Sequence, residues 1–237
     1  MTSVRTAVLT LVVALAALLL LFASGIGYRQ EAWSLQVAFA MVRWAAYLGI
    51  AVSMLALLGA VLACRSGRAV VFFALALVIA GGTAFVPWRW KQVATSVPPI
   101  HDVTTDTQNP PRFVAILPLR ANAKNSAEYG GDSVAAQQRK GYPDLAPASF
   151  SEPTGVMFTR VRAAVDAMGW ELVAADSANG LVEATATTTW FGFKDDVVVR
   201  VRPADAGSRV DVRSVSRVGG SDVGTNAARI RAFLSRL

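Results

Sequence analysis

The clearest pattern in the chain is the alternation of apolar and polar residues between 180 and 224. The apolar positions of its two most regular runs are Val182, Ala184, Ala186, Val197, Val199 and Val201. Successive side chains of a β-strand point to opposite faces of the sheet, so each run predicts a strand that buries one face only. We expect Arg200, which lies between two of these valines, to face solvent.

A third run changes the face on which its apolar residues lie. Val210 and Val212 share one parity, whereas Val215 has the other. One extra residue in a strand re-aims the side chains that follow it, so we predict a β-bulge near 213–214. Residues 203–207 combine proline, aspartate and glycine, which favours a tight hairpin turn before this run.

Two helices and a fourth strand complete the predicted soluble domain. The first helix spans 151–168, with Ser151 as its cap, Pro153 in its first turn and Gly169 as its stop. Its apolar stripe consists of Phe158, Val161, Val165 and Met168. The fourth strand is 170–176, and the apolar face of the last helix consists of Ala227, Ile230, Phe233, Leu234 and Leu237. The pattern predicts an α+β fold in which a four-stranded antiparallel sheet packs with two helices.

The N-terminal part has a different pattern, with three long apolar runs. They are Ala7–Ala23, Trp44–Ala63 and Ala69–Trp88. A helix of about 20 residues crosses a hydrocarbon core of about 30 Å, so the runs predict an α-helical membrane region of three transmembrane helices. None carries an acid or a histidine at its centre, which removes the usual residues of a transporter or proton relay.

Charge divides along the same boundary. Residues 1–94 hold seven Lys and Arg against one acid, and residues 95–237 hold sixteen against fifteen. The net charge of +7 therefore belongs mainly to the membrane flanks. A nucleic-acid interface needs clustered positive charge on the soluble domain, so we expect no nucleic acid partner. The single cysteine, Cys64, leaves the soluble part without thiols.

Several blocks of the C-terminal half resemble one known family. The blocks are IHDVTTDTQNPP (100–111), YPDLAP (142–147), MGWELVAAD (168–176), TWFGFKDDVVVRVR (189–202) and SRVDVRSVSRVGGSDVGTNAARIRAFL (208–234). Together they are similar, over about residues 98–237, to the bacterial and plastid membrane protein family catalogued as domain of unknown function 1499. The resemblance implies no activity and no catalytic residue, because the family has none assigned.

We therefore predict a three-helix transmembrane region in 1–90, a proline-rich strap in 91–112 and an α+β domain in 113–237. Three spans put the two termini on opposite sides of the membrane. The positive-inside count is nearly balanced, but the two arginines of the short loop 64–68 and the usual architecture of the similar family favour export. We expect an inner (plasma) membrane protein with its C-terminal domain on the periplasmic side.

The predicted strap carries the only histidine of the chain, His101, together with Asp102 and Asp106. The pattern H-D-x-x-x-D offers metal ligands, or a general base with an orienting carboxylate. A metal site would need further nitrogen or sulfur ligands, so we predict no metal. In the alternative, Asp102 caps a turn and His101 makes a polar contact against the domain.

The tip of the predicted hairpin gathers aromatic and charged residues. They are Trp190, Phe191, Phe193, Lys194, Asp195 and Asp196. The two acids are candidates for acid and base chemistry, and the aromatics with the lysine are candidates for contact with lipid or a membrane partner. In the alternative, the rings pack into the core and the acids cap the turn. We expect at least one of the two phenylalanines to be exposed.

A glycine-rich loop joins the last strand to the last helix. Its candidate anion-binding or ligand-binding residues are Arg213, Arg217, Gly219, Gly220, Ser221 and Asp222. Free N–H groups at a helix N-terminus attract anions, and the arginines would add charge. The loop lacks the pattern of a P-loop or a dinucleotide fingerprint. In the alternative, the glycines adopt positive φ and Asp222 caps the helix.

Two functions of different class stay open. The first is a non-catalytic envelope accessory protein, anchored in the lipid bilayer, that binds a membrane or envelope protein or a lipid-like ligand and needs no cofactor. The second is a hydrolase or anion-binding enzyme that uses His101 and Asp102 with Asp195 and Asp196, or the loop 219–224. A pocket around which the histidine meets these acids would favour the enzyme.

Overall fold

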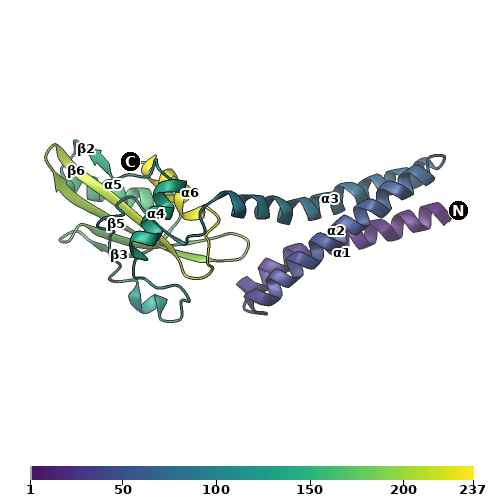
Figure 1. The fold of residues 1–237 in the computed structure, drawn as a ribbon, viewed down its shortest axis with the longest axis horizontal. Coiled ribbons are helices and arrows are strands. Elements are labelled where there is room, and N and C mark those ends of the chain that lie inside the picture. The colour runs from purple at the N-terminus through teal and green to yellow at the C-terminus, as the bar shows by residue number, and fades with distance from the viewer. Residues whose placement is uncertain (1) are drawn as a thin grey trace. The chain divides into compact units, whose positions relative to one another are not determined.

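The computed structural model describes residues 2–237, and their contacts divide them into two compact units. The first unit comprises the residues up to Gln92 together with Thr189–Gly192. Its long helices, labelled in Figure 1, are α1 (Thr2–Arg29), α2 (Leu35–Leu62) and α3 (Gly67–Ser96). Each helix is long and apolar enough to span a membrane, as the sequence predicts.

The long helices pack through small side chains. Fully buried small residues in them include Ala7, Ala14, Ala17, Ala38, Ala45, Ala56, Ala76 and Ala80. At Gly49 the backbones of α2 and α3 come so close that a Cβ atom would lie 2.8 Å from the carbonyl oxygen of Ala80. Such close backbone approach is typical of helices that associate in a membrane.

The segment predicted as a proline-rich strap is partly regular structure. Helix α3 continues through Pro87 and ends at Ser96. Strand β1 (Asp102–Thr104) then pairs antiparallel with the last strand of the sheet. The irregular connection is therefore shorter than the predicted 91–112, because β1 finds backbone partners far along the chain.

The second unit is an antiparallel sheet with helices, as predicted, but the sheet has six strands and not four. Its remaining elements are η1 (Leu117–Arg120), α4 (Gly131–Gly141), β2 (Ala148–Phe150), α5 (Thr154–Ala167), β3 (Glu171–Asp176), β4 (Leu181–Thr187), β5 (Lys194–Ala204), β6 (Gly207–Ser216) and α6 (Thr225–Leu234). The strand order is β1-β6-β5-β4-β3, and β2 also pairs with β6. Strands β1 and β2 are three residues long, too short to show alternation.

The irregularity of the sheet lies in β3 and not in β6. The register between β3 and β4 shifts between Leu172 and Ala174, whereas β6 pairs with β5 without interruption. The predicted bulge near 213–214 is therefore wrong. Val215 changes parity because it faces the opposite side of the sheet, where it packs in a small apolar cluster with Val198.

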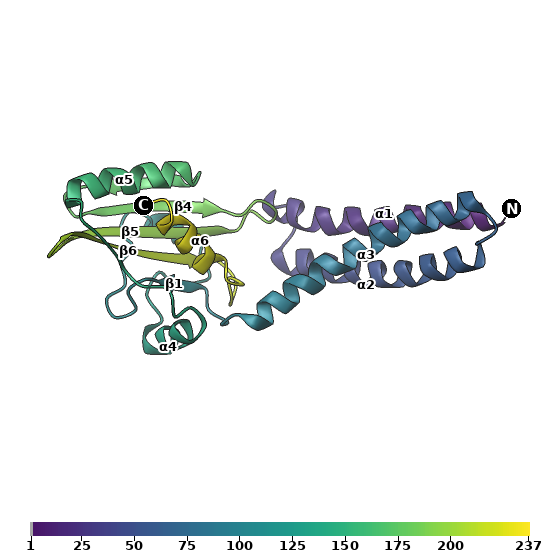
Figure 2. The same cartoon turned by 90° about the horizontal axis from the view of Figure 1, so that it is seen from above.

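The sheet has an apolar face and a charged face. Helices α5 and α6 cover the apolar face, which carries the main core, and Figure 2 shows α5 running beside β4. On the charged face, Phe113 and Ile116 pack against Val198 and Val215. These two residues belong to 105–129, which we call the covering segment. The prediction that only one face is covered is therefore wrong.

The helix stop predicted at Gly169 is confirmed. This residue has φ of 67°, a left-handed conformation that glycine adopts without strain. The helix begins at Thr154 and not at 151, with Pro153 at its N-cap and no side-chain cap. The hydroxyl of Ser151 donates to Glu152, so the predicted cap by Ser151 is wrong. Trp170, directly after the glycine, is half-buried and stacks on a phenylalanine ring of α6.

Candidate functional site

The charged face of the sheet carries clusters of carboxylates and arginines. In the largest cluster, Asp106 of the covering segment and Asp211 of β6 share three guanidinium groups, those of Arg200, Arg202 and Arg209. Arg209 bridges the two acids, with Nη2 2.8 Å from Asp106 and Nε 2.9 Å from Asp211. The cluster therefore ties the covering segment to β5 and β6.

Asp196 of β5 is the centre of a second cluster, and its side chain is fully buried. Arg120 Nη1 lies 2.5 Å from one of its oxygens and Arg217 Nη2 lies 2.8 Å from the other. The hydroxyl of Thr185 donates to the same carboxylate at 2.8 Å. Because Arg120 belongs to the covering segment and Asp196 to β5, this cluster holds the covering segment on the sheet at a second point.

The other two candidate acids are paired as well. Asp102 accepts two hydrogen bonds from Arg213, and Asp195 accepts one from Arg229 at 2.5 Å. Asp195 and Asp196 are adjacent in sequence but point to opposite faces of β5, since strand side chains alternate. The two acids of the predicted tip therefore do not act on one site.

His101 joins the domain through its backbone. Its carbonyl oxygen accepts hydrogen bonds from Ser216 N and Asn226 Nδ2, each at 3.0 Å. The side chains that donate hydrogen bonds to the four candidate acids are arginines and a threonine, and the histidine is not among them. Among residues 2–237, no group of three or more His, Cys, Asp or Glu side chains is arranged to hold a metal ion.

The glycine-rich loop before α6 is closed by its own aspartate. Asp222 accepts hydrogen bonds from the N–H groups of Gly224 and Asn226 at 3.0 and 2.6 Å. Burial raises the pKa of the Asp222 carboxyl above its ordinary value, and these two N–H groups act in the opposite direction. The N-terminus of α6 thus already has a carboxyl partner, which corresponds to the capping alternative.

The other candidates of this loop are not gathered around it. Arg213 and Arg217 belong to the ion pairs of the charged face. Gly219 and Ser221 accept hydrogen bonds from neighbouring groups of the domain. Gly220 is exposed.

Trp190 and Phe191 of the hairpin tip belong to the first unit, and Phe193 belongs to the second. Trp190 donates a hydrogen bond to a backbone carbonyl of α1, and the Phe191 ring packs against rings of α1 and α2. Phe191 is 6% exposed and Phe193 is half-buried, so the expected exposed phenylalanine is not found. Lys194 is exposed.

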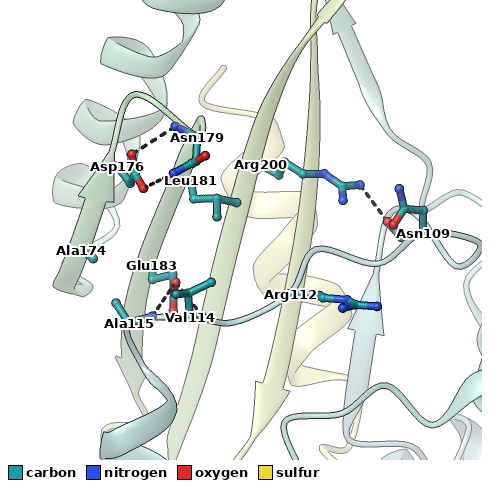
Figure 3. Close-up of a pocket in the computed structure, with 10 residues that line it drawn as sticks. All are labelled: Asn109, Arg112, Val114, Ala115, Ala174, Asp176, Asn179, Leu181, Glu183 and Arg200. Carbon is teal, nitrogen blue, oxygen red and sulfur yellow. Dashed lines mark hydrogen bonds between the residues drawn. The ribbon is translucent and has the colours of Figure 1, made fainter.

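A pocket of about 570 Å³ opens on the charged face (Figure 3). It is lined by Asn109, Arg112, Val114, Ala115, Ala174, Asp176, Asn179, Leu181, Glu183 and Arg200. Its floor includes a row of paired strand residues, Asp176 of β3, Leu181 of β4 and Arg200 of β5. The pairing fixes these three side chains on the same face of the sheet.

Glu183 of β4 shapes the wall of this pocket. Its carboxylate accepts hydrogen bonds from the N–H groups of Val114, Ala115 and Ile116 at 2.9, 3.0 and 3.0 Å. The bonds hold this stretch over the sheet, with Ile116 fully buried and Val114 60% exposed. The side chain of Val114 therefore remains available as an apolar wall.

A sequence model of the family described as protein of unknown function (DUF1499) matches residues 102–237, more than half of the chain. The chain belongs to this family. All six strands and the pocket lie within the DUF1499 domain. No curated protein and no solved structure matches the chain.

Two charges of the DUF1499 pocket stand apart from the arginine clusters. Arg112 is exposed, and Asp176 accepts hydrogen bonds from Asn179 N and Nδ2 at 3.1 and 2.7 Å. These hydrogen bonds lower the pKa of Asp176 below its ordinary value, so it is an anion at neutral pH. Sequence reasoning missed both charges, because Arg112 ends a predicted strap and Asp176 a predicted strand. The only local signal is the turn pattern D-x-x-N-G in 176–180.

Proposed function

We propose that this chain is a membrane-anchored accessory protein whose DUF1499 domain binds a lipid-like ligand and catalyses no reaction. The pocket on the charged face is the proposed binding site. The observation that carries the proposal is that every acid considered for catalysis is held by an arginine, whereas the pocket is open. The pairs are Asp102–Arg213, Asp106–Arg209, Asp195–Arg229 and Asp196–Arg120.

The pairing is unfavourable for catalysis. A general base must present a free oxygen to a substrate proton at hydrogen-bond distance. Here, turning a carboxylate towards a substrate would leave a buried guanidinium unpaired, which is costly. The acids are better explained as the anchors that hold the covering segment on the sheet.

The lining of the pocket suits a ligand with an apolar part. Val114, Ala115, Ala174 and Leu181 supply apolar surface beside a few charged groups, a composition common in small-molecule sites. The domain is covalently continuous with α3, a helix apolar enough to span a membrane. Membrane lipids are therefore the most accessible amphipathic molecules for this chain.

The proposal is tested with two aspartate substitutions on exposed valines. Val114 in the pocket wall is 60% exposed and Val156 on α5 is 55% exposed, so Val114→Asp and Val156→Asp are matched in burial. The full-length protein and both variants are purified in a mild detergent, and bound molecules are identified by mass spectrometry. We expect a lipid-like molecule on the parent protein and on Val156→Asp, and its loss from Val114→Asp. Equal recovery from all three, or a bound polypeptide in its place, would contradict the proposal.

We also propose that the protein resides in the inner membrane with this domain on the periplasmic side. The two arginines of the short loop 64–68 support a cytoplasmic position for that loop. Alkaline phosphatase fused after Leu237 should then be active. An inactive phosphatase, with an active cytoplasmic reporter at the same position, would reverse the orientation.

A further inference from the structure

The charges available to a ligand in the pocket are of opposite sign. Arg200 already donates to Asp211 and to the carbonyl of Asn109, at 2.9 and 2.8 Å. Glu183 is occupied by three backbone N–H groups. Among the residues that the structure describes, Arg112 and Asp176 are the charged lining groups that neither form an ion pair nor hold the covering segment.

These two charges lie on different sides of Leu181, the apolar residue of the floor. In Figure 3, Asp176 and Asn179 lie on one side of Leu181, and Arg112 lies on the other with Arg200. Asp176 and Arg200 are separated by one intervening strand, which places their backbones about 10 Å apart at the usual strand spacing. The pocket is therefore dipolar, and its lining carries two cations and two anions.

A dipolar pocket selects against ligands with a single charge. A plain anion would pair with Arg112 but would leave Asp176 without a counter-charge, and a plain cation would do the reverse. A zwitterion satisfies both groups at once, while its apolar part covers Leu181 and Val114. The amide nitrogen of Asn179 donates to Asp176, so the amide oxygen remains to accept an N–H from a primary ammonium.

We propose that the pocket binds a zwitterion with its phosphate on Arg112 and its primary ammonium on Asp176, the chemistry of a phosphoethanolamine headgroup. This inference rests on the proposed function, because it specifies the ligand of the same pocket. The headgroup can come from a membrane lipid or from a free soluble molecule. The apolar floor favours the lipid.

The test measures binding to the full-length protein in uncharged maltoside micelles by titration calorimetry. The probes are dihexanoyl phosphatidylethanolamine, free phosphoethanolamine and hexyl phosphate, which lacks the ammonium. We expect Arg112→Gln and Asp176→Asn each to weaken binding of the lipid about 5-fold, the effect of one exposed ion pair. The exposed Arg162 and Asp166 of α5 provide the controls, and Arg162→Gln and Asp166→Asn should leave the affinity unchanged.

The three probes and the variants distinguish between the ways in which the inference can fail. Tighter binding of the lipid than of free phosphoethanolamine supports a membrane source. Equal binding of the two, weakened in both cases by Arg112→Gln and by Asp176→Asn, supports a soluble source. If hexyl phosphate binds as tightly as the lipid and Asp176→Asn has no effect on the affinity, the proposal of a zwitterionic ligand is refuted. In that case, sensitivity to Val114→Asp would keep the pocket as a binding site. If no probe binds the parent protein, the inference is refuted. The proposed function is then still tested separately, by identifying the molecules that co-purify with the protein.

Discussion

Arg213 and Asp102 form a bidentate ion pair although 111 residues separate them in the chain, with Nε and Nη2 of the arginine 2.9 and 2.7 Å from the two carboxylate oxygens. Both side chains are buried, with 2% and 5% of their surface exposed. The guanidinium also lies over the rings of Phe113 and Tyr129, at 5.1 and 5.4 Å from their centroids. The pair therefore joins β1, β6 and the covering segment.

Asp102→Ala should lower the free energy of unfolding by about 3–5 kcal/mol, because it leaves the buried guanidinium of Arg213 without a counter-charge. The measurement is thermal or chemical unfolding of the full-length protein in micelles. The double variant Asp102→Ala/Arg213→Met removes both charges and should recover a large part of the loss. A double variant that is no more stable than the single one would show that this charge pair is not the cause.

Arg200→Asp should be strongly destabilising, by at least about 3 kcal/mol, because it removes a cation from a buried pair and adds a third carboxylate. Alternation alone assigns Arg200 to solvent and would make this change harmless. In the structure its Nη2 atom lies 2.9 Å from Asp211 and 3.5 Å from Asp106. The control is Arg162→Asp on the exposed surface of α5, which should change the unfolding free energy by less than about 0.5 kcal/mol. Similar stability of the two variants would contradict the assigned cluster.

Glu183→Ala should release the covering segment at the pocket. The change leaves the N–H groups of 114–116 without their acceptor, and losing such an acceptor costs about 1–3 kcal/mol. Limited proteolysis should then cut the chain near 112–119 faster than in the parent protein. Glu171→Ala, at an exposed position of β3, is the control and should leave the cleavage rate unchanged. Equal cleavage rates for the two variants would show that Glu183 does not anchor this segment.

Tyr129 and Tyr142 should ionise at a higher pH than exposed phenols do. Burial, reinforced by Asp102 for the first and by Asp222 for the second, raises the pKa of each to about 12. The folded state favours the neutral phenol, so this contribution to stability is complete below the ordinary pKa of 10.0 and is lost as pH rises towards 12. The difference in tyrosinate absorbance between the parent protein and Tyr129→Phe/Tyr142→Phe, followed against pH, isolates these two groups. A difference curve with its midpoint near 10 would contradict their burial.

The local patterns of the sequence determined the elements and the main core. Three apolar runs of about 20 residues are a property of contiguous sequence, and each became a long apolar helix. Val182 and Val199 lie on the apolar face because alternation encodes which side chains share a face. Gly169 ends a helix through its own backbone conformation, so its role could be inferred without any distant partner.

Contacts between distant parts of the chain decided the rest. Alternation separates the two faces of a strand but does not show whether water or another segment covers a face. It therefore did not predict that Arg200 pairs with an aspartate, or that Val215 packs under the covering segment. Strands β1 and β2 are stabilised by β6 and have no pattern of their own. Each candidate acid pairs with a different arginine. The pocket that holds Arg112 and Asp176 forms only because residues far apart in sequence meet on the charged face. Charge pairing of this kind depends on spatial distance, which sequence spacing does not encode.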